Sequence, residues 1–348
     1  IRDRLGQKPL YYFLDNENIH FGSSLLSLLK IIKEYKIDET QLYNYLDYGI
    51  ISSPFTLFKN IYKLMPSEIL TVDLQKNKFS ATKLKYWNVE NFLDDKTFNI
   101  EEFHNIFSES INLRTAADVP VANFLSGGID STSIVKNLVD NKKKVNTFSI
   151  YMNENKYDES FYIKEVVKKY NLEHKSTTIT SDISINDINQ ALNSTDEPYS
   201  DPSVVPAYIL SKEISKYYKV AISGDGGDEL LGGYERTIKS LQKSSFIRNL
   251  ISKSYNLYPP ILGTGNKLLA NSSNLEIKYR SFLEDKKLTK LLNVSSESNT
   301  YADGLDYEDI NYYKKLLIAD YRLYLPEMMM FKIDRTSMAN SLEVRSPF

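Results

Sequence analysis

Two glycine-rich stretches in the sequence carry residue types that can hold phosphate groups. The first runs from Phe124 to Ser131 and reads Phe-Leu-Ser-Gly-Gly-Ile-Asp-Ser. It follows an apolar, β-prone run at 119–125 and precedes apolar residues at helical spacing. A helix N-terminus presents unpaired backbone N–H groups, and glycine lets an anion approach the main chain. The pattern therefore predicts a strand, a loop and a helix, with a phosphate site at the loop.

An acidic residue, Asp130, stands among the groups expected to face phosphate. A carboxylate repels phosphate unless a cation lies between them, so one interpretation makes Asp130 a ligand of Mg2+. The alternative is an ordinary N-cap turn, in which Asp130 and Ser131 satisfy helix N–H groups. The glycine pair alone does not separate these two interpretations.

A second stretch of the same kind follows the strand-like run at 219–223. It reads Gly-Asp-Gly-Gly-Asp-Glu-Leu-Leu-Gly-Gly over 224–233. In a doubly wound sheet, ligands bind beyond the carboxyl ends of the strands, where the strand order reverses. We therefore expect the two loops to face one crevice, with Asp130 and Asp228 as shared Mg2+ ligands.

The elements that must position these loops alternate between helix and strand. Helices are expected at 100–114, 158–170 and 204–218, and strands at 119–125, 145–151 and 219–223. Such alternation is typical of right-handed βαβ units and a parallel sheet.

The first part of the chain has a different pattern. Short strands are expected at 10–14, 19–22, 69–74 and 79–87, with helices at 24–34 and 39–48, as in the end of an α+β domain. The polar stretch 90–97 is the preferred boundary, which gives predicted domains 1–89 and 90–348. The stretch 235–324 is expected to be mainly helical.

Composition limits the classes of function. The 348 residues suggest two domains, and a net charge of −2 gives no electrostatic footprint for nucleic acid. No apolar run approaches the ~18 residues of a membrane helix, so we expect no membrane partner and a cytoplasmic location. The sequence has no cysteine, which excludes a cysteine nucleophile within it, and its three histidines share no ligand spacing. The absence of a Gly-x-x-x-x-Gly-Lys-Ser/Thr motif argues against γ-phosphoryl transfer of the P-loop type.

Four motifs resemble one family. Residues 126–131 resemble the pyrophosphate loop of ATP pyrophosphatases, and 223–234 narrow the resemblance to glutamine-dependent asparagine synthetases of the B type. The start, Arg-Asp-Arg-Leu-Gly-Gln-Lys-Pro-Leu-Tyr-Tyr at 2–12, resembles the late glutaminase-domain motif of that family. The end, Lys-Ile-Asp-Arg-Thr-Ser-Met-Ala-Asn-Ser-Leu-Glu-Val-Arg-Ser-Pro-Phe at 332–348, resembles its C-terminal signature. The four motifs span the chain in the expected order.

The resemblance implies a doubly wound parallel sheet of the ATP pyrophosphatase type, preceded by the C-terminal part of an α+β Ntn-type glutaminase domain. It implies ATP and Mg2+ as cofactors, aspartate and glutamine or ammonia as substrates, and a reaction through β-aspartyl-AMP; a homodimer is left open. ATP binding is assigned to Leu125, Ser126, Gly127, Gly128, Asp130, Ser131, Ile150, Ser223 and Gly224, metal binding to Asp130 and Asp228, and formation of the adenylate to Asp225. Arg335 and Arg345 are candidates for pairing with phosphate or substrate carboxylate, although a salt bridge from Arg345 to Glu343 is the favoured role.

The same resemblance predicts that the chain is a fragment lacking both ends. The family's glutaminase cysteine is expected before Ile1, and a lysine that stabilises the adenylated intermediate is expected after Phe348. The family also has a glutamate and a lysine where this chain has Ser24 and Leu25.

Two rival functions remain open at this point. Related synthetases close a β-lactam or macrolactam ring from an internal amine, and a relative can bind nucleotide without catalysis. Against the second stand four acids, Asp130, Asp225, Asp228 and Glu229, which a simple binder has no chemical reason to keep.

Overall fold

The computed structural model describes residues 1–15, 17–73, 80–93, 97–152, 158–179, 183–241 and 311–348, with six isolated residues between them at 250, 254, 259, 268, 289 and 292. The chain divides into two compact units. The first comprises Ile1–Leu93, Asp196–Asp201 and Leu231–Phe331, and the second comprises Asp94–Thr195, Pro202–Leu230 and Lys332–Phe348.

The second unit is built on a five-stranded sheet in the order β10-β9-β6-β7-β8. Its strands are β6 (Val121–Phe124), β7 (Asn146–Met152), β8 (Glu173–Ile179), β9 (Val220–Ile222) and β10 (Glu343–Arg345). Every neighbouring pair is parallel. From β6 the chain passes to β7 and β8 on one side and then returns to β9 on the other side. The strand order therefore reverses between β6 and β9.

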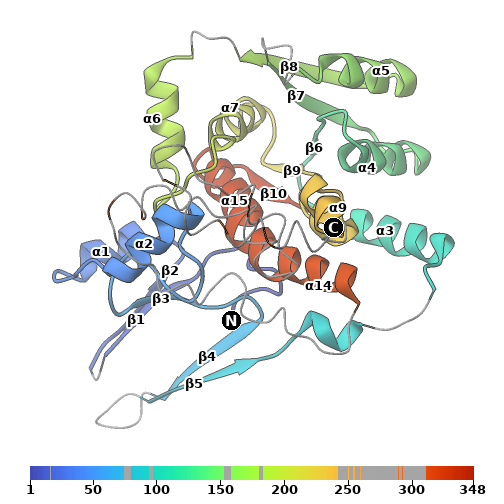
Figure 1. The fold of residues 1–348 in the computed structure, drawn as a ribbon. Coiled ribbons are helices and arrows are strands. Elements are labelled where there is room, and N and C mark those ends of the chain that lie inside the picture. The colour runs from blue at the N-terminus through green and yellow to red at the C-terminus, as the bar shows by residue number, and fades with distance from the viewer. Residues whose placement is uncertain are drawn as a thin grey trace. The chain divides into compact units, whose positions relative to one another are not determined.

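Helices cover both faces of this sheet (Figure 1). One apolar core joins the sheet to α3 (Ile100–Thr115), α4 (Ile129–Asp140) and α5 (Ser160–Tyr170) through residues such as Ile111, Val135 and Ile163. The opposite core joins it to α7 (Val204–Ser215) and α15 (Phe331–Met338) through Ile214 and Ile333. Helix α6 (Ile185–Asn193) packs against α7. Burial of apolar side chains on both faces is the condition under which an all-parallel sheet is stable.

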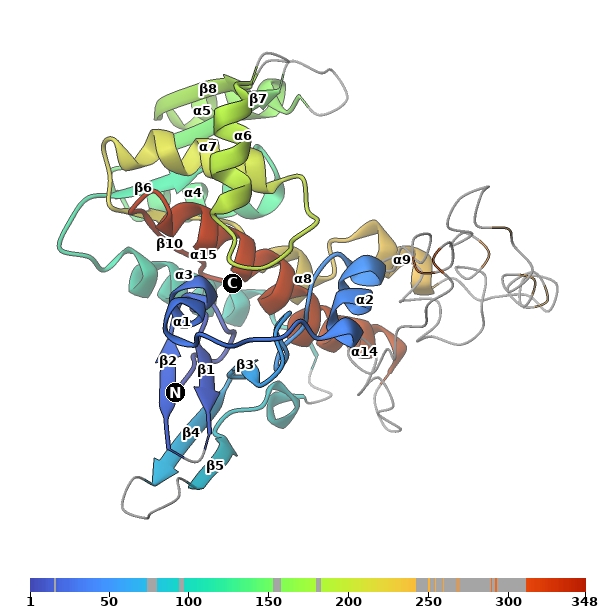
Figure 2. The same ribbon diagram turned by 90° about the vertical axis from the view of Figure 1, so that its left-hand side faces the viewer.

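The first unit contains a three-stranded antiparallel sheet in the order β2-β1-β3 and a separate hairpin, β4-β5 (Figure 2). The strands are β1 (Tyr11–Leu14), β2 (Ile19–Gly22), β3 (Ile61–Lys63), β4 (Glu68–Asp73) and β5 (Ser80–Lys85). Helix α1 (Leu25–Ile31) packs on the three-stranded sheet in a small apolar core. Helix α2 (Glu39–Tyr48) begins after Asp38, whose side chain accepts from Thr40 N–H, and ends at Gly49 with a φ of +73°.

The remaining described helices are short or continuous with one another. They are η1 (Val89–Phe92), α8 (Gly227–Leu231), α9 (Glu235–Leu241), α14 (Tyr312–Ala319) and the π-helix η4 (Asp320–Met330), which runs on into α15. Among the described residues, no helix is both long enough and apolar enough to cross a membrane.

The predicted doubly wound parallel sheet is confirmed by the strand order and the two covered faces. Among the described elements, β3, β8, β10, η1, α6, α8 and α15 were not predicted. The first compact unit ends its first segment at Leu93 and also includes 196–201 and 231–331, so the two units are not divided at one point in the sequence. The proposed boundary at 89/90 stays a sequence-based prediction. Most of the helical prediction between 235 and 324 lies outside the described residues.

Candidate active site

The first glycine-rich loop connects β6 to α4, as predicted. Leu125 N–H donates to Phe148 O at 2.9 Å, and Ser149 Oγ donates to Leu125 O, so the start of the loop is tied to β7. The two serine hydroxyls of the loop lie 3.1 Å apart, and Ser126 N–H donates to Ser131 Oγ at 3.2 Å. Hydrogen bonds between Ser126 and Ser131 therefore connect the two ends of the loop.

Gly127 is the position in this loop that only glycine fits. Its φ is +78°, in the left-handed region that disfavours side chains. A Cβ there would stand 2.8 Å from Tyr162 Cβ and 3.0 Å from Ile163 N, both in α5. Gly128 differs, because its φ is −69° and a Cβ would meet only Ser126 Oγ at 3.2 Å.

The N-cap interpretation of Asp130 and Ser131 is not what the structure shows. The N-cap of α4 is Gly128, which makes no side-chain cap hydrogen bond. Ser131 Oγ accepts from the loop N–H of Ser126 and donates to Gly128 O. Within the described residues, the Asp130 carboxylate makes no hydrogen bond. Neither side chain caps the helix, although Asp130 still benefits from the helix dipole in its first turn.

The second glycine-rich loop follows β9 and enters α8. Ser223 is 2% exposed, and its N–H donates to Arg345 O at 3.0 Å. The buried Ser223 Oγ has no hydrogen-bond partner among the residues that the structure describes. Such an orphaned hydroxyl is costly unless a ligand or water completes it, so it is a candidate contact for a bound group.

The two loops lie against each other. A Cβ on Gly224 would stand 3.1 Å from Ser131 N, and a Cβ on Gly227 would stand 2.5 Å from Asp130 Cγ. Glycine at 227 therefore makes room for the Asp130 carboxylate. Since these loops follow β6 and β9, their junction lies at the point where the strand order reverses, the expected ligand position in such sheets.

Three acids come together at this junction. Burial, and then the neighbouring carboxylates of Asp228 and Asp225, raise the pKa of Asp130 to about 6. The neighbouring carboxylates contribute to this rise because they repel the charged form of Asp130 in the metal-free protein. A divalent cation beside Asp130 would relieve the repulsion, so the arrangement fits Mg2+.

The acids do not form a complete protein cage for a metal. Among the described residues, no three His, Cys, Asp or Glu side chains are grouped closely enough to hold an ion. Mg2+ usually keeps several waters and uses one or two carboxylates together with substrate phosphates. An ion at Asp130 and Asp228 would therefore depend on phosphate oxygens for the rest of its ligands.

Ile150, the predicted neighbour of adenine, lies on β7 and is partly buried. Phe124 pairs with Phe148 in the parallel register, and Ile150 comes two residues further along β7, beyond the last residue of β6. Leu125, which is 2% exposed, begins the loop at the same level. The structure thus brings all nine proposed ATP-binding residues and the acids Asp225 and Asp228 into one unit. Their roles stay predictions.

The two arginine candidates differ in their surroundings. Arg345 Nε lies 2.9 Å from Glu343 Oε1, and its Nη1 donates to the carbonyls of Arg114 and Ala116. The favoured salt bridge is confirmed, and this guanidinium joins β10 to the end of α3. Arg335 lies in α15 and is partly buried.

The sequence did not reveal what supports the second loop. Ser346 Oγ donates to Asp225 O, and a Cβ on Gly226, whose φ is +94°, would meet Phe348 Cβ at 3.2 Å. The C-terminal motif therefore contacts the loop directly. The run Gly-Asp-Gly-Gly signals a crowded backbone, but no local pattern identifies Phe348 or Tyr162 as the neighbours.

A parallel sheet covered on both faces, with glycine-rich loops at its reversal point, defines this unit as a doubly wound α/β fold. Residues 102–348 match the family model described as asparagine synthase, and residues 1–87 match the glutamine amidotransferase domain. The first match covers well over half of the chain, and the chain belongs to the asparagine synthase family.

Curated relatives agree with this assignment. The chain is 28% identical over its whole length to glutamine-hydrolyzing asparagine synthetase 1 of Bacillus subtilis, and it covers 57% of that protein. It is 36% identical, over 72% of its length, to the putative glutamine-hydrolyzing asparagine synthetase 2 of Methanocaldococcus jannaschii, of which it covers 49%. The chain therefore spans about half of the length of these relatives.

Among solved structures, the U34-tRNA thiolase NcsA from Methanococcus maripaludis matches 64% of this chain and 73% of its own, with 15% identity and a TM-score of 0.30. A glutamine-dependent NAD+ synthetase from Acinetobacter baumannii in complex with ADP matches 74% of this chain and 63% of its own, with 11% identity and a TM-score of 0.29. The doubly wound fold is assigned from the strand order of the sheet, and not from these two structures.

Proposed function

We propose that this protein amidates L-aspartate to L-asparagine, using ATP and forming β-aspartyl-AMP, with ammonia that derives from glutamine. AMP and pyrophosphate are the other products. The observation that supports the proposal best is the contact between the two glycine-rich loops at the reversal point, with Asp130 beside Asp225 and Asp228. Membership of the asparagine synthase family agrees with it.

The chemistry explains why such a site is needed. A carboxylate is a poor acyl donor because oxide would be its leaving group. Attack of the aspartate side-chain carboxylate on the α-phosphate of ATP forms an acyl phosphate bond and breaks the bond to pyrophosphate. Ammonia then attacks the acyl carbon and AMP leaves. The protein must therefore stabilise the negative charge that develops on pyrophosphate.

The first loop is suited to receive pyrophosphate. Gly127 and Gly128 expose the main chain at the N-terminus of α4, a 12-residue helix whose dipole favours an anion there. The hydroxyls of Ser126 and Ser131 would exchange their mutual hydrogen bond for phosphate oxygens. Because Gly127 is fixed by its φ and by Tyr162, the loop is held in shape before the ligand arrives.

The remaining residues have roles set by their positions. Leu125 and Ile150 would flank adenine at the ends of β6 and β7, and Ser223 and Gly224 would line the opposite side of the nucleotide. Asp130 and Asp228 would hold Mg2+, which when bound neutralises charge on the phosphates. Asp225, which lies between Gly224 and Gly226 and whose carbonyl accepts from Ser346 Oγ, is proposed to act where the adenylate forms.

The cytoplasm remains the expected location of this activity, since all the proposed substrates are small metabolites. A homodimer is not required by any residue of the proposed site.

The products of ATP cleavage test the proposal. Incubation with aspartate, ATP, Mg2+ and ammonium should yield asparagine, AMP and pyrophosphate in equal amounts. Formation of ADP and phosphate would contradict it, because cleavage would then occur at the γ-phosphate. AMP and pyrophosphate without asparagine would contradict the proposed acceptor and favour the ring-closing alternative.

A further inference from the structure

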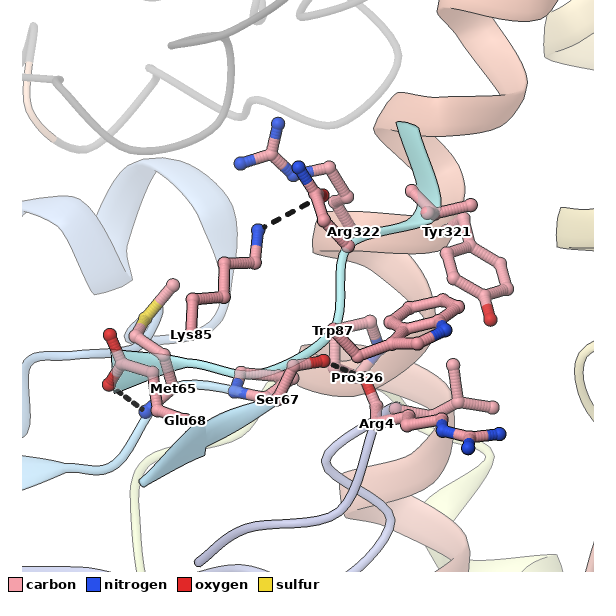
Figure 3. Close-up of a pocket in the computed structure, with 13 residues that line it drawn as sticks. Arg4, Met65, Ser67, Glu68, Lys85, Trp87, Tyr321, Arg322 and Pro326 are labelled. Carbon is pink, nitrogen blue, oxygen red and sulfur yellow. Dashed lines mark hydrogen bonds between the residues drawn. The ribbon is translucent and has the colours of Figure 1, made fainter. Parts of the chain in front are cut away.

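The first unit contains a pocket of about 270 Å3 that the proposed function does not use (Figure 3). It is lined by Arg4 and Leu5, by residues 65–68, by Lys85 at the end of β5, by residues 87–89, and by the π-helix η4. None of the residues assigned to the nucleotide site lines it. Its volume lies near the lower end of the range for small-molecule sites, which is about 300–1,000 Å3.

One wall of the pocket is aromatic. The rings of Trp87 and Tyr321 have centroids 6.2 Å apart at 46°, and Phe92 stacks on Trp87 at 5.8 Å. Figure 3 shows the Trp87 and Tyr321 rings side by side, with Pro326 beneath them. Burial raises the pKa of Tyr321 to about 12, so this ring stays uncharged. A flat apolar group can stack on such a wall.

Positive charge flanks this aromatic wall, with Arg4 beside the Trp87 ring and Lys85 in another part of the lining (Figure 3). Arg4 and Lys85 have no carboxylate within ion-pair distance among the residues described. Lys85 Nζ donates to Asn88 Oδ1 at 3.2 Å, and the Arg4 guanidinium stands 6.0 Å from the centre of the Trp87 ring. Arg322 is already paired with Glu90 at 2.8 Å. Burial, and then the charge of Arg322, lower the pKa of Lys85, as expected where cations gather.

The one acid that lines the pocket is engaged by the backbone. Glu68 Oε2 accepts from Met65 N–H at 3.1 Å. The lining therefore contains three cations, Arg4, Lys85 and Arg322, and one carboxylate. A small anion would meet a net positive surface.

We propose that this pocket binds a small aromatic carboxylate, with its ring on Trp87 and Tyr321 and its carboxylate on Lys85. The volume favours a single ring over a nucleotide. The carboxylate matches the Lys85 ammonium group, since charge-assisted hydrogen bonds are the strong ones. The site is separate from the proposed asparagine chemistry, and its occupation does not depend on that function.

Trp87 makes the proposal directly measurable, because it is the only tryptophan in the sequence. Titration of the 348-residue chain with benzoate should quench its fluorescence saturably, with half-saturation below about 10 mM, the affinity range of small weak ligands. Benzamide keeps the ring without the charge, and acetate keeps the charge without the ring. Each should bind at least about tenfold more weakly. Isothermal titration with the same compounds is the second measurement.

Two variants assign the cations. Lys85→Gln should weaken benzoate binding about fivefold, the upper range for a partly exposed charge pair. Arg4→Gln, which removes a cation beside the Trp87 ring, should weaken it less. Neither residue has an ion-pair partner among the described residues, so the melting temperature should not change. Lys83→Gln is the matched control, because Lys83 lies on the same strand but stands over the ring of Tyr12. It should leave binding unchanged.

The proposal fails if neither method detects saturable benzoate binding. It also fails if benzamide or acetate binds as well as benzoate, or if Lys83→Gln weakens binding as much as Lys85→Gln.

Discussion

At Gly127, backbone geometry and packing both require the absence of a side chain. The φ of +78° and the 2.8 Å distance from a built Cβ to Tyr162 are independent constraints. We expect Gly127→Ala to destabilise the protein by about 2–4 kcal/mol, from left-handed strain and overpacking together. Gly128→Ala is the control and should lose about 1 kcal/mol or less, as at an ordinary N-cap. Denaturant unfolding measures both. Equal losses would contradict the structural difference.

Asp130 gives a prediction with a defined dependence on pH. Its pKa is raised from 3.8 to about 6, so the folded state retains a proton that the unfolded state releases. The folded protein therefore loses stability as pH rises from about 4 to about 6. Without metal, Asp130→Asn should be more stable than the parent at pH 7 by about 1 kcal/mol, allowing for solvent screening, and the gain should vanish near pH 4.

Melting curves in the presence of a chelator, at both pH values, check this expectation. Asp140→Asn on the same helix is the control, because Asp140 is exposed and paired with Lys136, and it should show no such gain. With Mg2+ and ATP, Asp130→Asn should also lower nucleotide affinity and reduce pyrophosphate release by about 10-fold to 100-fold. Stability that is unaffected by pH, together with unchanged Mg2+ dependence, would remove Asp130 from the metal site.

At the scale of elements, local signals account for most of what the sequence predicted. Strand β2 and helix α2 agree with their predicted bounds, and α2 has both an Asp38 cap and a left-handed Gly49. Strand β8 lacked such a signal because its residues, Glu-His-Lys-Ser-Thr-Thr-Ile, are mostly polar at an edge of the sheet. Strand β10 has three residues and depends on pairing with β9, which is distant in sequence. Nonlocal contacts such as these leave no periodic pattern.

The candidate site was predictable to a similar extent. Motif chemistry identified both loops, because glycine, serine and acid residues are needed next to phosphate regardless of the rest of the chain. The contacts of Gly127 with Tyr162 and of Gly226 with Phe348 were not predictable, because they depend on how distant segments pack.

A buried ion pair holds the segment 196–201 within the first unit. Lys63 Nζ lies 2.7 Å from Glu197 Oε2 and 3.7 Å from Glu327 Oε2, and all three side chains are less than 9% exposed. Nearby, Leu25 N–H donates to Asp196 Oδ2 at 2.7 Å. Leu25 is one of the two residues that stand where the resembled family has a glutamate and a lysine, and its backbone N–H makes this contact.

Removing the cation of this cluster should be costly. Lys63→Met leaves buried carboxylates without their neighbouring positive charge, and we expect a loss of about 3–5 kcal/mol. The double variant Lys63→Met with Glu197→Gln should recover part of that loss. Lys136→Met, which breaks an exposed pair with Asp140, is the control and should change stability by less than about 0.5 kcal/mol. If the two lysine variants lose equal stability, burial does not strengthen the Lys63 cluster.

At the scale of the whole molecule, composition limits the source of nitrogen. The 348 residues include no cysteine, although residues 1–87 match a glutamine amidotransferase domain. Thiolate attack on the glutamine amide is the cysteine chemistry that such a domain would need, and no side chain in this sequence supplies it. We therefore expect this chain to release no glutamate from glutamine. Any asparagine that it forms should require added ammonium.

Glutamate release and asparagine formation are measured in parallel, with glutamine or ammonium as the only nitrogen source. Asparagine synthetase 1 of Bacillus subtilis, which is named as glutamine-hydrolyzing, is the positive control under the same conditions. Lys83→Gln serves as a folded variant with an altered surface, and it should behave as the parent chain does. Glutamate release above the rate in buffer alone would show that a nucleophile other than cysteine acts in residues 1–87, and the amidotransferase chemistry would then need a different explanation.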